Sequence, residues 1–180
     1  MRWAQGLLRQ PRQALSVSQI DAHFSHNKEH PPLAKWLIGS GRMIGHEWLG
    51  WWSASDASRL GICAMLALAA MVAFAFTLSR AGPLPAWFAG LSLVLFPRFA
   101  FHGRVPTLDL TVAATTSLFL LIFWRLHRQR GYRPLIVMGL VFGLALASKL
   151  NAPFALIGCG LYWMTEQLRH SRVSKTGITL

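Results

Sequence analysis

Acidic residues are scarce in this sequence, and the few charges that it carries are mostly of one sign. Six Asp and Glu stand against 18 Lys and Arg in 180 residues, which gives a formal net charge of +12. Charged residues make up 13% of the chain, about half the share found in soluble domains, whereas 53% of the residues are hydrophobic. This composition excludes a soluble globular domain. It also argues against a nucleic-acid partner, because long apolar runs separate the basic residues.

Cysteine is also rare. The only two, Cys63 and Cys159, lie inside apolar runs without CxxC spacing, which excludes a disulfide framework and a cysteine-based zinc cluster. We interpret both as small apolar residues. The polar region 1–32 lacks the apolar core of a signal peptide, so we expect no cleaved targeting segment there.

Five apolar runs predict about five transmembrane helices within residues 59–165. They are Leu60–Leu78, Leu84–Phe96, Leu110–Trp124, Leu135–Ala147 and Ala152–Met164. The first is long enough to cross a hydrocarbon core of about 30 Å, and the third reaches a similar length if it begins near Val105. A polar loop follows Pro97. Residues 148–151 separate the last two runs, which we interpret as two short helices, with one long kinked helix as the alternative.

The remaining segments flank this bundle. Residues 33–52 are partly apolar and rich in tryptophan, which indicates an amphipathic helix lying in the membrane interface. We therefore predict an all-α fold: a polytopic membrane helix bundle with an N-terminal external amphipathic segment. Residues 1–58 form the external segment and residues 166–180 a cytoplasmic basic tail. The expected location is the cell membrane, in a bacterium the cytoplasmic membrane, with membrane lipid as a partner.

Basic residues near the helix ends predict the orientation. Arg80, the loop 125–133 and the C-terminal tail outnumber the cations on the other side and should be cytoplasmic. The N-terminal 58 residues then lie outside with no helix before them, so we expect a further transmembrane helix upstream of Met1.

Three polar constellations are expected on that external side. Glu29 and His30 begin the run Glu-His-Pro-Pro-Leu-Ala-Lys, whose prolines favour a helix start. Such residues can hold an anion, a metal or a proton, or can be a solvated pair before an interfacial helix. The spacing of His23, His26 and His30 is too generic to predict a metal site.

The second constellation runs from Pro97-Arg98 to Asp109, and the third is Lys149. Asp109 lies where a helix begins, and it either pairs with Arg104 or positions an acceptor or a metal. Lys149 either extends its ammonium to the membrane surface or binds a phosphate.

In this order, the three motifs resemble membrane glycosyltransferases of the protein O-mannosyltransferase and aminoarabinose-transferase type. The matching residues are Glu29 to Lys35, the stretch from Pro97 to Asp109, and Gly-Leu-Ala-Leu-Ala-Ser-Lys at 143–149. The resemblance implies a GT-C fold and sugar transfer from a polyprenyl-phosphate donor to a hydroxyl-type acceptor. It places Glu29, His30, Arg104 and Lys149 near the donor phosphate, and Asp109 in the same external cavity, where we assign it the catalytic role.

The resemblance is incomplete in one respect. In the family an acidic motif that follows the first transmembrane helix supplies the general base, and this sequence contains neither that helix nor that motif. We therefore expect an internal portion of a larger enzyme, and the sequence leaves open whether this portion is active by itself. The alternatives are a non-catalytic membrane subunit or gene remnant, and a small transporter with Asp109 and Lys149 in its pathway. The cofactor is unknown; the acids and histidines are compatible with a divalent metal and do not require one.

Overall fold

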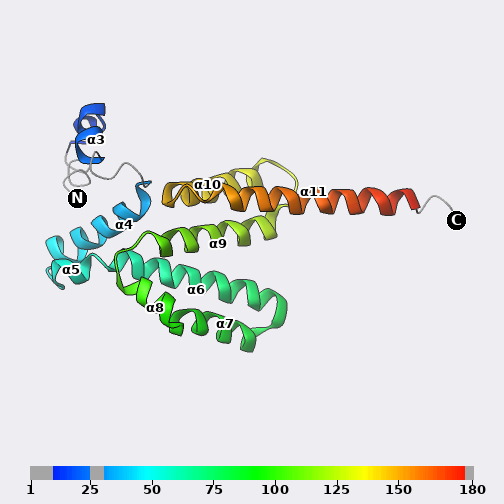
Figure 1. Ribbon diagram of the computed structural model, residues 1–180, viewed down its shortest axis with the longest axis horizontal. Helices are drawn as coiled ribbons and strands as arrows, with labels where there is room; N and C mark the ends of the chain where they lie inside the picture. Colours follow the sequence, from blue (N-terminus) through cyan, green and yellow to red (C-terminus); the bar gives the residue numbers. More distant parts are fainter. Residues whose placement is uncertain (1–9, 25–30, 177–180) are drawn as a thin grey trace.

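The structure is a computed structural model that describes residues 10–24 and 31–176. Within these ranges all regular structure is helical and no strand occurs, which confirms the all-α prediction (Figure 1). The helices are α2 Pro11–Ala14, α3 Val17–Phe24, α4 Leu33–Arg42, the π-helix η2 Met43–Trp48, α5 Ala54–Ala57, α6 Leu60–Ala81, α7 Pro83–Leu95, α8 Pro97–Arg104, α9 Asp109–Leu126, α10 Tyr132–Ser148 and α11 Pro153–Thr176.

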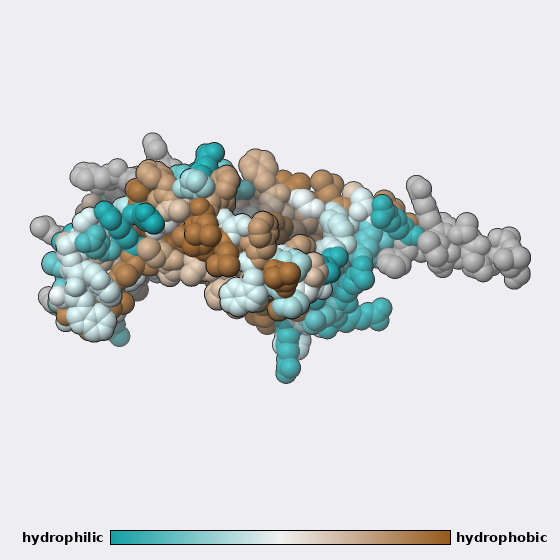
Figure 2. All heavy atoms as spheres, turned by 90° about the horizontal axis from the view of Figure 1, so that it is seen from below, coloured by the Kyte–Doolittle hydropathy of each residue, from teal (hydrophilic) through white to brown (hydrophobic). Residues whose placement is uncertain are grey.

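Two helical segments are long and apolar enough to cross a membrane, namely residues 54–81 and α9. Helices α7 and α8 together form a third, broken span with a bend of 59°, and α10 is apolar but shorter. Large apolar side chains such as Leu84, Phe88 and Leu95 are 81%, 75% and 74% exposed, as expected where lipid replaces water. Figure 2 shows apolar residues over the middle of the molecule. The chain is a membrane helix bundle.

The bundle has two chemically different ends. Helix α6 turns at Gly82, whose φ of 86° suits glycine, and α7 returns beside it; α9 packs on α6, and α10 packs on α9. The starts of α6 and α9 and the ends of α7 and α10 therefore lie together, and we call this the Asp109 end. The opposite end holds Arg80 and the loop 125–133, and we call it the basic end (Figures 1 and 2).

The polar loop expected after Pro97 is mostly a helix. Pro97 occupies the first turn of α8 and Phe96 is extended before it, because proline presets its own φ and disfavours helical geometry in the preceding residue. The same rule determines where α9 begins. Val105 precedes Pro106 and is extended (φ −113°, ψ 136°), so α9 begins at Asp109 and not near Val105.

The last two apolar runs form separate helices, as interpreted. Lys149 is extended between them (φ −162°, ψ 148°), and Pro153 begins α11. Helix α11 continues through the basic tail to Thr176, beyond residue 165, the predicted end of the transmembrane region. No glycine or proline interrupts residues 161–176.

The predicted amphipathic segment is formed by α4 and η2. Its small residues are buried where α4 packs on α6, and α4 also contacts α10. The approach is close: a Cβ placed on Gly61 would lie 2.3 Å from the carbonyl oxygen of Leu37. The exposed residues of the segment and of the turn after it include Trp48, Trp51 and Trp52.

Candidate functional site

An ion pair joins two of the predicted site residues at the Asp109 end. Asp109 is the first residue of α9 and Lys149 directly follows α10, and the Lys149 Nζ donates to Asp109 Oδ1 at 3.0 Å. The lysine side chain is 30% exposed and the carboxylate is 62% exposed. Forty residues apart in the sequence, the two groups form an accessible acid–base pair.

A buried polar contact fixes the position of Lys149 along α9. The hydroxyl of Ser148, which is fully buried, lies 3.0 Å from that of Thr115 on α9. Each hydroxyl also reaches a carbonyl of its own helix, Leu144 at 2.9 Å and Thr111 at 2.8 Å. Interhelical contacts of this kind are common between membrane helices that pack closely. They hold the end of α10 beside the start of α9, and so hold Lys149 beside Asp109.

Asp109 also borders a hollow of about 200 Å³ between α8 and α9. Arg98 and His102 line it one helical turn apart on α8, together with Phe99 and apolar residues of α9. The Nδ1 of His102 lies 3.5 Å from the hydroxyl of Thr107, a long contact that favours one orientation of the ring. With Lys149, which pairs with Asp109, two fixed cations lie beside one carboxylate. The net charge favours an anionic ligand.

Arg104, a predicted phosphate ligand, lies apart from this hollow. It is exposed at the last residue of α8, two positions beyond His102, and residues two apart on a helix project from different faces. The structure pairs Asp109 with Lys149 and not with Arg104, the partner considered as one of two alternatives for this acid. Arg98 and His102 belonged to the polar stretch but were not singled out; their four-residue spacing behind a proline would have indicated a shared helix face.

The other predicted ligands, Glu29 and His30, lie outside the described residues. The helix that they were expected to precede does begin after Pro31-Pro32, at Leu33, and it contacts both α6 and α10. Within residues 10–24 and 31–176, no group of three or more His, Cys, Asp or Glu side chains is placed to hold a metal ion.

An apolar helix bundle with a cation-rich hollow beside a carboxylate at one end defines a membrane protein with a polar site at the bilayer boundary. The sequence matches the model of the dolichyl-phosphate-mannose-protein mannosyltransferase family over residues 29–180, and the chain belongs to this family. It is thus a glycosyltransferase of the mannosyltransferase type by family, with the GT-C fold. The comparison with curated proteins and the comparison with solved structures gave no match.

Proposed function

We propose that the chain transfers a sugar from a polyprenyl-phosphate donor to a hydroxyl-type acceptor at the Asp109 end, on the external face of the membrane. The observation that carries this proposal is the Asp109–Lys149 pair beside a hollow lined by Arg98 and His102. A base for the acceptor and cations for the leaving phosphate thus occur together at one end of the bundle.

Each group has a defined part in the proposed reaction. Asp109 accepts the proton of the acceptor hydroxyl as its oxygen attacks the anomeric carbon of the sugar. The bond from that carbon to the phosphate oxygen breaks, and the electron pair leaves with the polyprenyl phosphate. The phosphate thereby gains one negative charge, which Lys149 and Arg98 stabilise. Arg104, Glu29 and His30 remain proposed contacts to the donor phosphate.

The placement of Lys149 beside the carboxylate supports this division of roles. The ammonium of Lys149 is the hydrogen-bond donor to Asp109. A donor phosphate offers the same ammonium a second anion, and moving it toward that phosphate would free a carboxylate lone pair for the acceptor proton. The exposure of both groups leaves room for two substrates to approach.

Two substitutions and one control test the proposal in membrane vesicles that contain the full chain. The donor is radiolabelled polyprenyl-phosphate mannose, and the readout is label incorporated into membrane protein. Asp109→Asn and Lys149→Gln should each lower incorporation by about 100-fold, within the range that a general base or an electrostatic donor supplies. Asp56→Asn is the matched control, because Asp56 is an exposed acid in the first turn of α5 that pairs with Arg59.

The outcomes separate the enzyme from its alternatives. Carbonate-resistant membrane association should be equal in all variants, which shows that insertion is unaffected. Undiminished transfer in both site variants would remove Asp109 and Lys149 from the site. No transfer by the unsubstituted chain would contradict the proposal and favour a non-catalytic membrane subunit.

A further inference from the structure

Two further hollows lie along α9 and α11, away from the Asp109 end. The larger is an apolar groove of about 510 Å³ between α6, α9 and α11, a volume in the range of small-molecule sites. Val72, Leu121 and Gly158 line its middle, and Phe123, Trp124 and Tyr162 line the part nearest the basic end.

The smaller hollow, about 450 Å³, lies next to the groove at the basic end. His127, Arg128 and Arg130 line it from the loop after α9, and Trp163 and Glu166 line it from α11. We call it the basic pocket.

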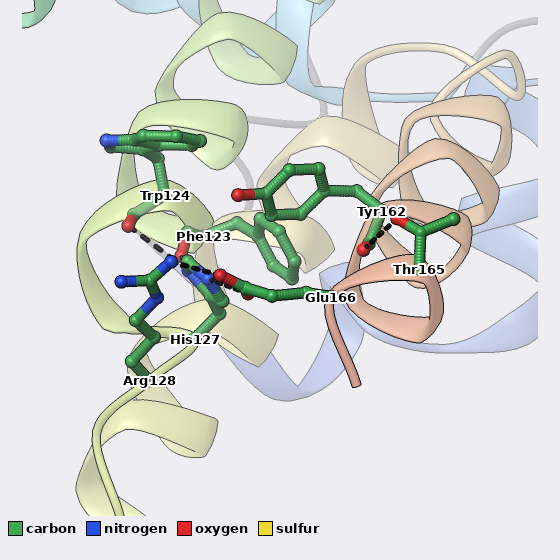
Figure 3. A network of polar contacts seen from close by, with 7 residues as sticks. All are labelled: Phe123, Trp124, His127, Arg128, Tyr162, Thr165 and Glu166. Carbon is green, nitrogen blue, oxygen red and sulfur yellow. Dashed lines mark hydrogen bonds and ion pairs between the residues drawn. The ribbon is translucent and has the colours of Figure 1, made fainter. Parts of the chain in front are cut away.

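A layer of packed aromatic rings lies between the two hollows. His127 stacks on Phe123 with ring centroids 5.0 Å apart, and the ring of Tyr162 meets His127 edge-on at 5.7 Å (Figure 3). Because Phe123 and Tyr162 line the groove and His127 lines the basic pocket, the two hollows are neighbours, and a ligand that extends past this ring contact reaches both.

Glu166 is already occupied by partners from the α9 side. It accepts a hydrogen bond from Arg128 and lies 3.0 Å from His127 Nε2 (Figure 3). The arginine hydrogen bond, with a smaller contribution from His127, lowers the pKa of Glu166, so the carboxylate stays charged at neutral pH. Arg128 and Arg130 set two fixed positive charges against the one carboxylate of Glu166 in the basic pocket, an excess of one before His127 is counted.

We propose that the groove and the basic pocket together bind one anionic phospholipid, with its phosphodiester beside Arg130 and Arg128 and one acyl chain in the groove. A phosphodiester carries the single negative charge that the pocket lacks. Trp124 and Trp163 lie at the junction, the level at which tryptophan meets lipid headgroups. A zwitterionic lipid fits less well, because its ammonium would need Glu166, which Arg128 and His127 already hold.

Native mass spectrometry of the purified full chain in detergent micelles tests the proposal, with dioleoylphosphatidylglycerol and dioleoylphosphatidylcholine as probes. Phosphatidylglycerol should bind more tightly. Arg130→Gln should weaken its binding about fivefold, the effect of one arginine near a membrane surface. Arg133→Gln removes the same charge from an exposed position at the basic end that does not line the pocket, and should leave the affinity within about twofold.

A second variant pair tests the groove. A Cβ on Gly158 or on Gly160 would meet nothing within 4 Å, so both positions on α11 accept a larger side chain without a clash. Gly158 lines the groove and Gly160 does not. Gly158→Leu should therefore displace the acyl chain and weaken phosphatidylglycerol binding more than about tenfold, whereas Gly160→Leu should not.

Three results would overturn the proposal: equal binding of the two lipids, equal effects of the two arginine variants, or equal effects of the two glycine variants. A groove covered by another protein segment would give the last of these. The proposal does not depend on the transferase reaction, since lipid binding is measured without donor or acceptor.

Discussion

Helix α4 rests on α6 through a backbone contact that leaves no room for a methyl group at Gly61. A Cβ there would lie 2.3 Å from the Leu37 carbonyl oxygen and 2.9 Å from the Leu37 Cβ. Ordinary contact distances are about 3.5 Å, so α4 must move by about 1 Å to admit alanine. The obstacle is backbone, which cannot rotate away as a side chain can.

The magnitude follows from two opposing effects. Overpacking of this kind costs about 1–3 kcal/mol, and replacing glycine by alanine in a helix returns up to about 1 kcal/mol. Because the obstacle is backbone, the overpacking cost lies at the upper end of its range, and we expect Gly61→Ala to destabilise the chain by about 2 kcal/mol and to lower Tm by about 4–8 °C. Gly139→Ala is the matched control, because a Cβ on Gly139 meets nothing within 4 Å.

The measurement is thermal unfolding in detergent, followed by intrinsic tryptophan fluorescence. Gly139→Ala should leave Tm unchanged or raise it. If Gly61→Ala were as stable as Gly139→Ala, the close packing of α4 on α6 would be refuted, and with it the placement of α4 near the end of α10.

Two further predictions concern the contacts that join helices. Thr115→Val removes the contact with Ser148 and should lower stability by about 1 kcal/mol, whereas Thr116→Val should cost nothing, since the buried Thr116 hydroxyl has no partner among the described residues; Tm values that fall equally would contradict this. The lowered pKa of Glu166 means that its ion pair contributes stability that is complete above the unfolded-state value near 4.5 and declines as pH falls below it. Tm measured from about pH 6 to about pH 3 should therefore fall less steeply in Glu166→Gln than in the unsubstituted chain, and parallel curves would refute the assignment.

The sequence predicts the helices well because an apolar run bounded by charges or prolines is a local signal. Each of the five predicted runs contains a helix, and the break at residues 148–151 falls where Lys149 and Asn151 interrupt the apolar pattern. The length of α11 was missed because its last turns are polar. Hydropathy marks where the residues of a helix change from apolar to polar. The helix itself continues until a residue such as glycine or proline ends it.

The partners of the site residues are set by packing and are harder to predict. Arg104 is near Asp109 in the sequence and was one partner considered for it. The turn at Val105 and Pro106 separates the two, and Lys149 reaches Asp109 across the α9–α10 contact. Helix α8 was missed because its polar residues resemble a loop when they are counted without their four-residue spacing.

The proposed reaction requires Asp109 and Lys149 to act on the substrates as well as to pair with each other. Exchanging them, Asp109→Lys with Lys149→Asp, keeps opposite charges at the same two helix ends. Because the pair is partly exposed, the exchange should change stability by about 1 kcal/mol at most. We expect the exchanged chain to insert normally and to transfer mannose about 100-fold less than the unsubstituted chain, like each single variant. Full transfer by the exchanged pair would show that only the ion pair matters, and would contradict the catalytic roles proposed for Asp109 and Lys149.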